Sequence, residues 1–214
     1  MLLNYFNDPT ILIVASLIMV MALIFHNIVQ TWVARRYGDL TPSYQGYGQF
    51  DPQTHLEPLG VIFLLIFGFG WAKQIPVNSR NYRGRGRQEA IVWYAGPASY
   101  LLVALVTWFV AVAFNTAGAG SSLVGAFVVA GNVAILHAVI HIFPVYPLDG
   151  ARAALAWGNP QVRRLVQQVA QYGFIGFIVI FMLLSYSGVL GAVQRFFANI
   201  ILGAIQAVFR AFGG

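Results

Sequence analysis

The sequence predicts an all-α polytopic membrane protein with about five transmembrane helices, a re-entrant segment and a small interfacial β-sheet. Of its 214 residues, 59% are hydrophobic and only 8% are charged, whereas a soluble globular domain carries roughly 25% charged residues. The chain contains no cysteine, which excludes disulfides and thiolate metal sites. The net charge of +6 comes from short arginine clusters between apolar runs, so we expect contact with a lipid bilayer and not with nucleic acid.

Five apolar runs are long enough for transmembrane helices, because about 20 residues cross a hydrocarbon core of roughly 30 Å. These runs cover residues 10–34, 90–114, 123–143, 165–186 and 189–209. Asp8 and Pro9 form a helix start signal before the first run. The last run carries several polar side chains, so it either crosses the membrane or lies partly in the interface.

The apolar run 59–71 covers only about two thirds of the length that a crossing needs, which suggests a re-entrant or half-spanning segment. Tyrosine, phenylalanine and glycine alternate with polar residues over 41–50 (TPSYQGYGQF), and residues 72–78 form another short segment. We interpret these two segments as the strands of the interfacial sheet.

Three arginine clusters, in residues 35–36, 80–87 and 152–164, indicate the orientation in the membrane. If the run 59–71 enters and returns on the same side, all three clusters lie on one face. The positive-inside rule makes that face cytoplasmic and leaves the N-terminus outside. We expect this topology in a bacterial or archaeal cytoplasmic membrane.

Polar residues inside the apolar runs are the candidate functional residues, since ionisable groups at membrane depth are costly and usually functional. His26 and Gln30 lie four residues apart on one helix face, with Asn27 beside them. His137 and His141 have the same spacing in the third run. The alternative for His137 is a structural role, in which its side chain forms a hydrogen bond to a neighbouring helix.

Asp149 follows the third run in the segment PVYPLDG, in which the prolines end the helix. A carboxylate at such a place needs a metal, another cation or hydrogen-bond donors, although a simple turn or capping role is the alternative. Glu57 precedes the short apolar run, where pairing with an arginine is favoured over catalysis. We expect His26, His141 and Asp149 to lie near one face of the bilayer.

In chain order, several segments resemble the site-2 protease family of intramembrane zinc metalloproteases. They are FHNIVQTWVARRYGD, THLEPLG, FGWAKQIPVNSRNYR, AGPASY and HIFPVYPLDGAR, and together they span residues 25–152. The resemblance implies a membrane core over residues 1–152, with a metal motif on the first helix, a small sheet at the membrane face and an aspartate supplied later. Residues 153–214 would then form C-terminal transmembrane or interfacial helices.

The family's first helix carries HExxH, in which two histidines bind zinc and the glutamate is the general base. Here the motif reads HNIVQ. By the resemblance, His26 takes the first ligand position, Asn27 the catalytic position and Gln30 the second ligand position, where an amide oxygen is only a weak zinc ligand. Asp149 keeps the position of the third ligand.

Two further departures concern the residues that hold the substrate. The family has asparagine at the positions of Tyr100 and His141, and the resemblance makes these two, with Asn132, the candidates for a substrate or partner groove. The sequence therefore predicts a pseudoprotease that binds a transmembrane protein or serves as a subunit of a membrane complex. No cofactor is expected for it.

Two alternatives remain. The first is an active zinc metalloprotease with a rearranged site, in which His26, His141 and Asp149 are the ligands. The second is a haem or chlorin carrier with histidine axial ligands, for which His137 and His141 are the candidates.

Overall fold

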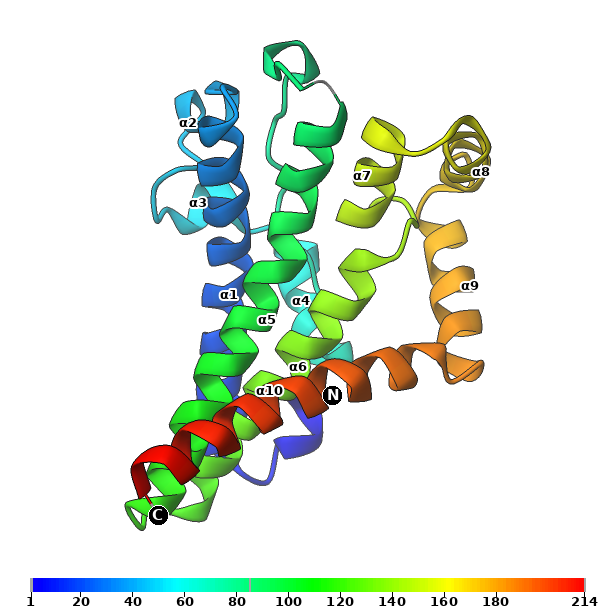
Figure 1. The fold of residues 1–214 in the computed structure, drawn as a ribbon. Helices are drawn as coiled ribbons and strands as arrows, with labels where there is room; N and C mark the ends of the chain where they lie inside the picture. Colours follow the sequence, from blue (N-terminus) through cyan, green and yellow to red (C-terminus); the bar gives the residue numbers. More distant parts are fainter. Residues whose placement is uncertain (1, 85, 214) are drawn as a thin grey trace.

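The computed structural model describes residues 2–84 and 86–213, and helices dominate it (Figure 1). Within these residues, four helices are long and apolar enough to cross a membrane. They are α1 (Pro9–Arg36), α5 (Gly86–Thr116), α6 (Ser121–Ile142) and α10 (Val189–Gly213). The protein is thus an integral membrane protein, as the composition predicts.

Shorter helices connect the long ones. They are the 3₁₀ helices η1 (Leu2–Tyr5) and η2 (Ser79–Asn81), and the α-helices α2 (Thr41–Tyr44), α3 (Pro52–His55), α4 (Pro58–Phe67), α7 (Asp149–Trp157), α8 (Pro160–Ala170) and α9 (Gly173–Tyr186).

Helices α1, α5 and α6 pack side by side as the core of the molecule (Figure 1). Their buried faces carry small residues, among them Ala22, Ala104 and Ala134. A Cβ atom on Gly131 of α6 would lie only 2.9 Å from Thr107 Oγ1 of α5. Small residues therefore allow the helix backbones to approach closely, as is typical of helix packing in membranes.

Helix α10 runs obliquely across α5 and α6 (Figure 1). One face of it is buried through Ile201 and Ile205, while most of its other side chains are exposed. The prediction of a helix over residues 189–209 is confirmed. Whether this helix crosses the membrane or lies in the interface stays a prediction.

The prediction of one continuous helix over residues 165–186 is wrong. The chain forms α8 and α9 instead, with axes 111° apart. Gly173 has a φ of 55° at the start of α9, and this left-handed conformation suits glycine. The break also separates a polar helix from an apolar one, because α8 reads PQVRRLVQQVA and α9 reads GFIGFIVIFMLLSY.

Residues 59–71 form a short helix followed by a return segment. Helix α4 is about 15 Å long at 1.5 Å per residue and ends at Gly68, whose φ is 73°. The chain then packs back against α4, since a Cβ atom on Gly70 would lie 2.7 Å from the Cβ of Leu64. The structure thus shows the expected reversal, while the depth of the segment in the membrane stays a prediction.

The predicted interfacial sheet is wrong for the residues that the structure describes. Residues 41–50 begin with helix α2, for which Pro42 is a favourable first-turn residue, and then pass through turns at Gly46. Residues 72–78 are extended, but their one β-bridge joins Ala72 to Leu56. The extended segment therefore has no strand partner along most of its length.

Asp39 joins these loops to the end of α1. Its carboxylate accepts hydrogen bonds from the backbone of Thr41 and Asn78 and from the side chains of Asn81 and Tyr82. Burial raises the pKa of Asp39, but hydrogen bonds from Thr41, Asn78 and Asn81 outweigh that effect and hold the pKa below its ordinary value.

The arginine clusters gather at one end of the helix bundle. Arg35 and Arg36 line a surface cleft together with Arg83, and Arg163 lines a neighbouring cleft with Glu89. The expectation that all three clusters lie on one face of the membrane stays a prediction. That the face is cytoplasmic stays a prediction.

Candidate metal centre

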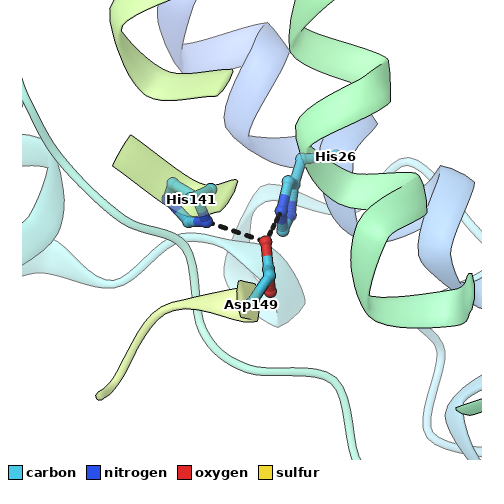
Figure 2. Close-up of side chains that lie close together, drawn as sticks. All are labelled: His26, His141 and Asp149. Carbon is cyan, nitrogen blue, oxygen red and sulfur yellow. Dashed lines mark hydrogen bonds and ion pairs between the residues drawn. The ribbon is translucent and has the colours of Figure 1, made fainter. Parts of the chain in front are cut away.

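His26, His141 and Asp149 come together from α1, α6 and the first turn of α7, and their side chains point toward one another (Figure 2). Asp149 Oδ2 lies 2.7 Å from His26 Nε2 and 2.7 Å from His141 Nδ1. One potential ligand atom from each residue lies within 4.8 Å of the others, and all three residues are buried. The juxtaposition expected from the sequence is present.

Glycines allow the three helices to bring these side chains together. A Cβ atom on Gly150 would lie 2.6 Å from the carbonyl carbon of Ile142, so α7 can begin close to the end of α6. A Cβ atom on Gly96 of α5 would lie 2.6 Å from Gln30 Nε2 and closer still to His26 Nε2. Sequence reasoning did not single out Gly96 as a site residue, although it belongs to the family segment AGPASY.

Asn27 contacts His26 and the return segment after α4. Its Nδ2 donates to the carbonyl oxygen of Lys73 over 2.7 Å, and its Oδ1 lies 3.0 Å from His26 Nδ1. The Lys73 carbonyl can only accept, which assigns the amide nitrogen to that side. Asn27 Oδ1 therefore accepts a hydrogen bond from the Nδ1–H of His26.

Gln30 directs its amide nitrogen, not its oxygen, toward the site. Gln30 Nε2 donates to the carbonyl oxygen of Trp93 over 3.1 Å and to Asp149 Oδ1 over 3.0 Å. An amide NH₂ group is a donor and does not bind a metal ion. In this geometry Gln30 is a hydrogen-bond donor to Asp149, and the weak metal-ligand role that its position in the motif suggests stays a prediction.

His137 lies one helical turn from the cluster and has a structural role. Its Nδ1 donates to the carbonyl oxygen of Val133 over 2.8 Å, and its Nε2 accepts from the backbone N–H of Gly70 over 3.1 Å. Both ring nitrogens form hydrogen bonds to the backbone, so the geometry favours the structural role for His137. The haem or chlorin alternative stays a prediction.

Of the three residues expected to line a groove, Tyr100 and His141 lie together, with ring centroids 5.5 Å apart, whereas Asn132 lies elsewhere on α6. The buried ring of Tyr100 stacks on His26, with ring centroids 4.9 Å apart, and its hydroxyl group has no hydrogen-bond partner. Asn132 is exposed on α6, where its backbone oxygen accepts a 3.4 Å hydrogen bond from Gln194. A groove formed by Tyr100, His141 and Asn132 stays a prediction.

A cleft of about 140 Å³ opens onto the cluster. Its walls carry His26, Gln30, His141 and Asp149 together with the aromatic residues Phe69, Trp71, Trp93, Phe174 and Phe177. Asp149 is the single carboxylate among its described lining residues, and Glu57 is not one of them. The cleft combines apolar walls with one polar cluster, as ligand-binding sites commonly do.

A bundle of apolar helices around a buried His–Asp–His cluster defines a membrane protein whose interior carries side chains of the types that can ligate a metal ion. The chain is 31% identical over 198 residues to "Putative zinc metalloprotease YwhC" of Bacillus subtilis (strain 168), a match that covers 90% of both chains. This relationship and the motif order show that the chain belongs to the site-2 protease family of intramembrane zinc metalloproteases.

A second relative agrees with this assignment. The chain is 27% identical over 197 residues to "Putative zinc metalloprotease Rip2" of Mycolicibacterium smegmatis (strain ATCC 700084 / mc(2)155), covering 89% of this chain and 71% of that protein. No protein-family model matches the chain, and the search of solved structures gives no significant match.

Proposed function

We propose that this protein is a proteolytically inactive member of the site-2 protease family that binds a transmembrane segment of a partner protein. The observation that carries the proposal is Asn27, an amide at the position of the family's catalytic glutamate. An amide has no group that accepts a proton from water near neutral pH. Loss of a general base typically removes a factor of about 10² to 10⁴ in rate.

The surroundings of Asn27 support this proposal. Its amide is held between His26 and the Lys73 carbonyl oxygen, so it is bound to the scaffold on both sides. The one described carboxylate in the cleft is Asp149, which already contacts His26, His141 and Gln30. Among the described residues that line the cleft, no second carboxylate is available to replace the missing base.

The walls of the cleft support the binding role. Five aromatic side chains line the cleft, and such walls suit an apolar peptide segment. A photocrosslinking residue at Phe174, which lines the cleft, is expected to label a single-span test peptide in proteoliposomes. The same probe at Ile200, exposed on α10, is the control for contacts made by diffusion in the bilayer.

Cleavage is tested in the same proteoliposomes. The purified protein is incubated with single-span peptides, with and without added Zn²⁺, and the products are analysed by mass spectrometry. We expect no cleavage under either condition. Cleavage that a chelator and His26→Ala both abolish would overturn the proposal.

The double variant Asn27→Glu with Gln30→His extends the test, because it restores both side chains of the family motif. We expect the double variant to bind zinc, and any proteolytic activity of the double variant to depend on the bound metal.

A second candidate function is an active metalloprotease with a rearranged site. The observation that favours it is the convergence of ligand atoms from His26, His141 and Asp149 within 4.8 Å, because catalytic zinc sites use three protein ligands and leave one position open. Zinc-dependent cleavage that is lost in both His26→Ala and His141→Ala would support this candidate against the first.

A further inference from the structure

We propose that His26, His141 and Asp149 bind one divalent transition-metal ion, and that Asn27 and Gln30 are positioning residues that orient two of these three ligands. The ligand set differs from the family's because its second histidine comes from α6 and not from the motif on α1. The inference goes beyond the proposed function, because an ion can be bound here whether or not a peptide bond is cleaved.

The donor set fits such an ion. Two imidazole nitrogens and one carboxylate are ligands typical of zinc and of non-haem iron(II). All three side chains are buried and meet at the cleft, so an ion has a route to them. Calcium and magnesium are disfavoured, since they prefer oxygen ligands throughout.

The hydrogen bonds of His26 indicate which ring nitrogen is presented. Because Asn27 Oδ1 accepts the proton on Nδ1, a neutral imidazole has a bare lone pair at Nε2. That lone pair lies 2.7 Å from Asp149 Oδ2, an oxygen that also only accepts when the carboxylate is ionised. Nε2 of His26 and Oδ2 of Asp149 thus face each other as two potential ligand atoms at the position proposed for the ion.

Asn27 therefore lies where a residue is needed to orient His26 as a metal ligand. Such a histidine usually donates its second ring N–H to a carboxylate, a carbonyl oxygen or water, which determines its tautomer and ring orientation. For His26, the amide oxygen of Asn27 is the acceptor of this hydrogen bond. The Lys73 carbonyl oxygen in turn holds the amide in place.

Gln30 acts in the same way on the carboxylate. Its Nε2 donates to Asp149 Oδ1, which leaves Oδ2 as the oxygen that faces both histidines. The second contact of Gln30 Nε2, to the Trp93 carbonyl oxygen, holds this amide in place. The two carboxamides thus occupy the positions from which outer hydrogen bonds orient metal ligands.

His141 completes the set. Its Nδ1 faces Asp149 Oδ2, while its buried Nε2 has no hydrogen-bond partner. Neighbouring His137, by contrast, has both ring nitrogens engaged by the backbone. The one specific polar contact of the His141 ring is therefore at the cluster, which supports a role for its Nδ1 as a ligand.

The test is metal binding by the full-length protein in detergent. The metal-stripped protein is titrated with Zn²⁺ by calorimetry, bound metal is counted by elemental analysis, and Co²⁺ is used as a spectroscopic probe. We expect one ion per chain and visible cobalt bands. His26→Ala, His141→Ala and Asp149→Asn are expected to lose the bound ion, whereas His55→Gln, a change outside the cluster, is expected to retain it.

The positioning role has its own variants. Asn27→Leu and Gln30→Leu are each expected to weaken zinc binding by about 10- to 100-fold. Asn27→Asp keeps an acceptor for His26 and is expected to retain most of the affinity, which a purely structural role would not predict. Helical content and elution volume check that each variant is folded.

The outcomes separate this inference from the proposed function. Wild-type protein that binds no ion, or binding that is unchanged in His141→Ala, would overturn the metal site. Unchanged affinity in Asn27→Leu would overturn the positioning role. Zinc-dependent cleavage would overturn the proposed function alone, since an active site of this kind also needs the ion.

Discussion

Adding one methyl group at Gly96 is predicted to disturb both the helix packing and the metal centre. The new Cβ atom would lie 2.6 Å from Gln30 Nε2 and 2.8 Å from His26 Cδ2, whereas non-bonded heavy atoms prefer about 3.5–4.0 Å. His26 Nε2 would be closer still, so either α5 must move away from α1 by more than about 1 Å, or both side chains must leave their rotamers. Overpacking of this kind typically costs about 1–3 kcal/mol.

We therefore expect Gly96→Ala to lower the free energy of unfolding by about 1–3 kcal/mol and to weaken zinc binding. Unfolding is measured in mixed micelles, and metal binding by calorimetry. Gly203→Ala is the matched control, because Gly203 is exposed on α10 and a Cβ atom there meets nothing within 4 Å. Removing a glycine from a helix is expected to be neutral or stabilising by up to about 1 kcal/mol.

The reasoning would be refuted if Gly96→Ala matched the wild type in both stability and zinc affinity. A loss of stability without any change in zinc affinity would show that α5 moves away from α1 while His26 and Gln30 keep their positions. That result would contradict the predicted effect of the substitution on the metal centre.

Three further predictions concern residues around the site and the loops. Gly150→Ala is expected to weaken zinc binding, because its Cβ atom would clash with the carbonyl groups that end α6; calorimetry checks this. Asp39→Asn is expected to destabilise the fold by about 1–3 kcal/mol at pH 7, with a difference that shrinks as the pH falls below the ordinary pKa of an aspartate, because the pKa of Asp39 is lowered in the fold. Burial lowers the pKa of His55, so the folded state favours the neutral ring, and the free energy of unfolding should fall as the pH drops below about 6.5. The free energy of unfolding of His55→Gln, measured over the same pH range, should decrease less.

The long helices could be predicted because their apolar runs are longer than those of helices in the core of a soluble protein. The runs at 10–34, 90–114 and 123–143 correspond to α1, α5 and α6. Residues 165–186 also form one continuous apolar run in the sequence. Hydropathy, however, carries no information about the left-handed conformation of Gly173 between α8 and α9. The change of helix direction there was therefore not visible in the composition.

The prediction of strands at residues 41–50 and 72–78 was wrong for a related reason. Alternation of side chains describes a strand that has a partner, and the first of these segments folds into α2 and turns next to Asp39 instead. The second remains extended and is attached through hydrogen bonds to its backbone at Lys73 and Asn78. Such long-range contacts outweigh local preference.

The residues of the candidate site could be named from the sequence, whereas the hydrogen-bond partners of two of them could not. Polarity at membrane depth and the motif order pointed to His26, His141 and Asp149. The donor roles of Asn27 and Gln30 depend on the carbonyl oxygens of Lys73 and Trp93. A backbone carbonyl group is the same for every residue type, so only the fold reveals these partners.

X-ray absorption at the zinc edge tests most directly whether the metal ligands have moved from the α1 motif to the set made by His26, His141 and Asp149. Zinc-loaded wild-type protein should show two imidazole ligands and carboxylate oxygen, and His141→Ala should show only one imidazole or no bound zinc. A single imidazole in the wild type, or a coordination shell unchanged by His141→Ala, would contradict the assignment.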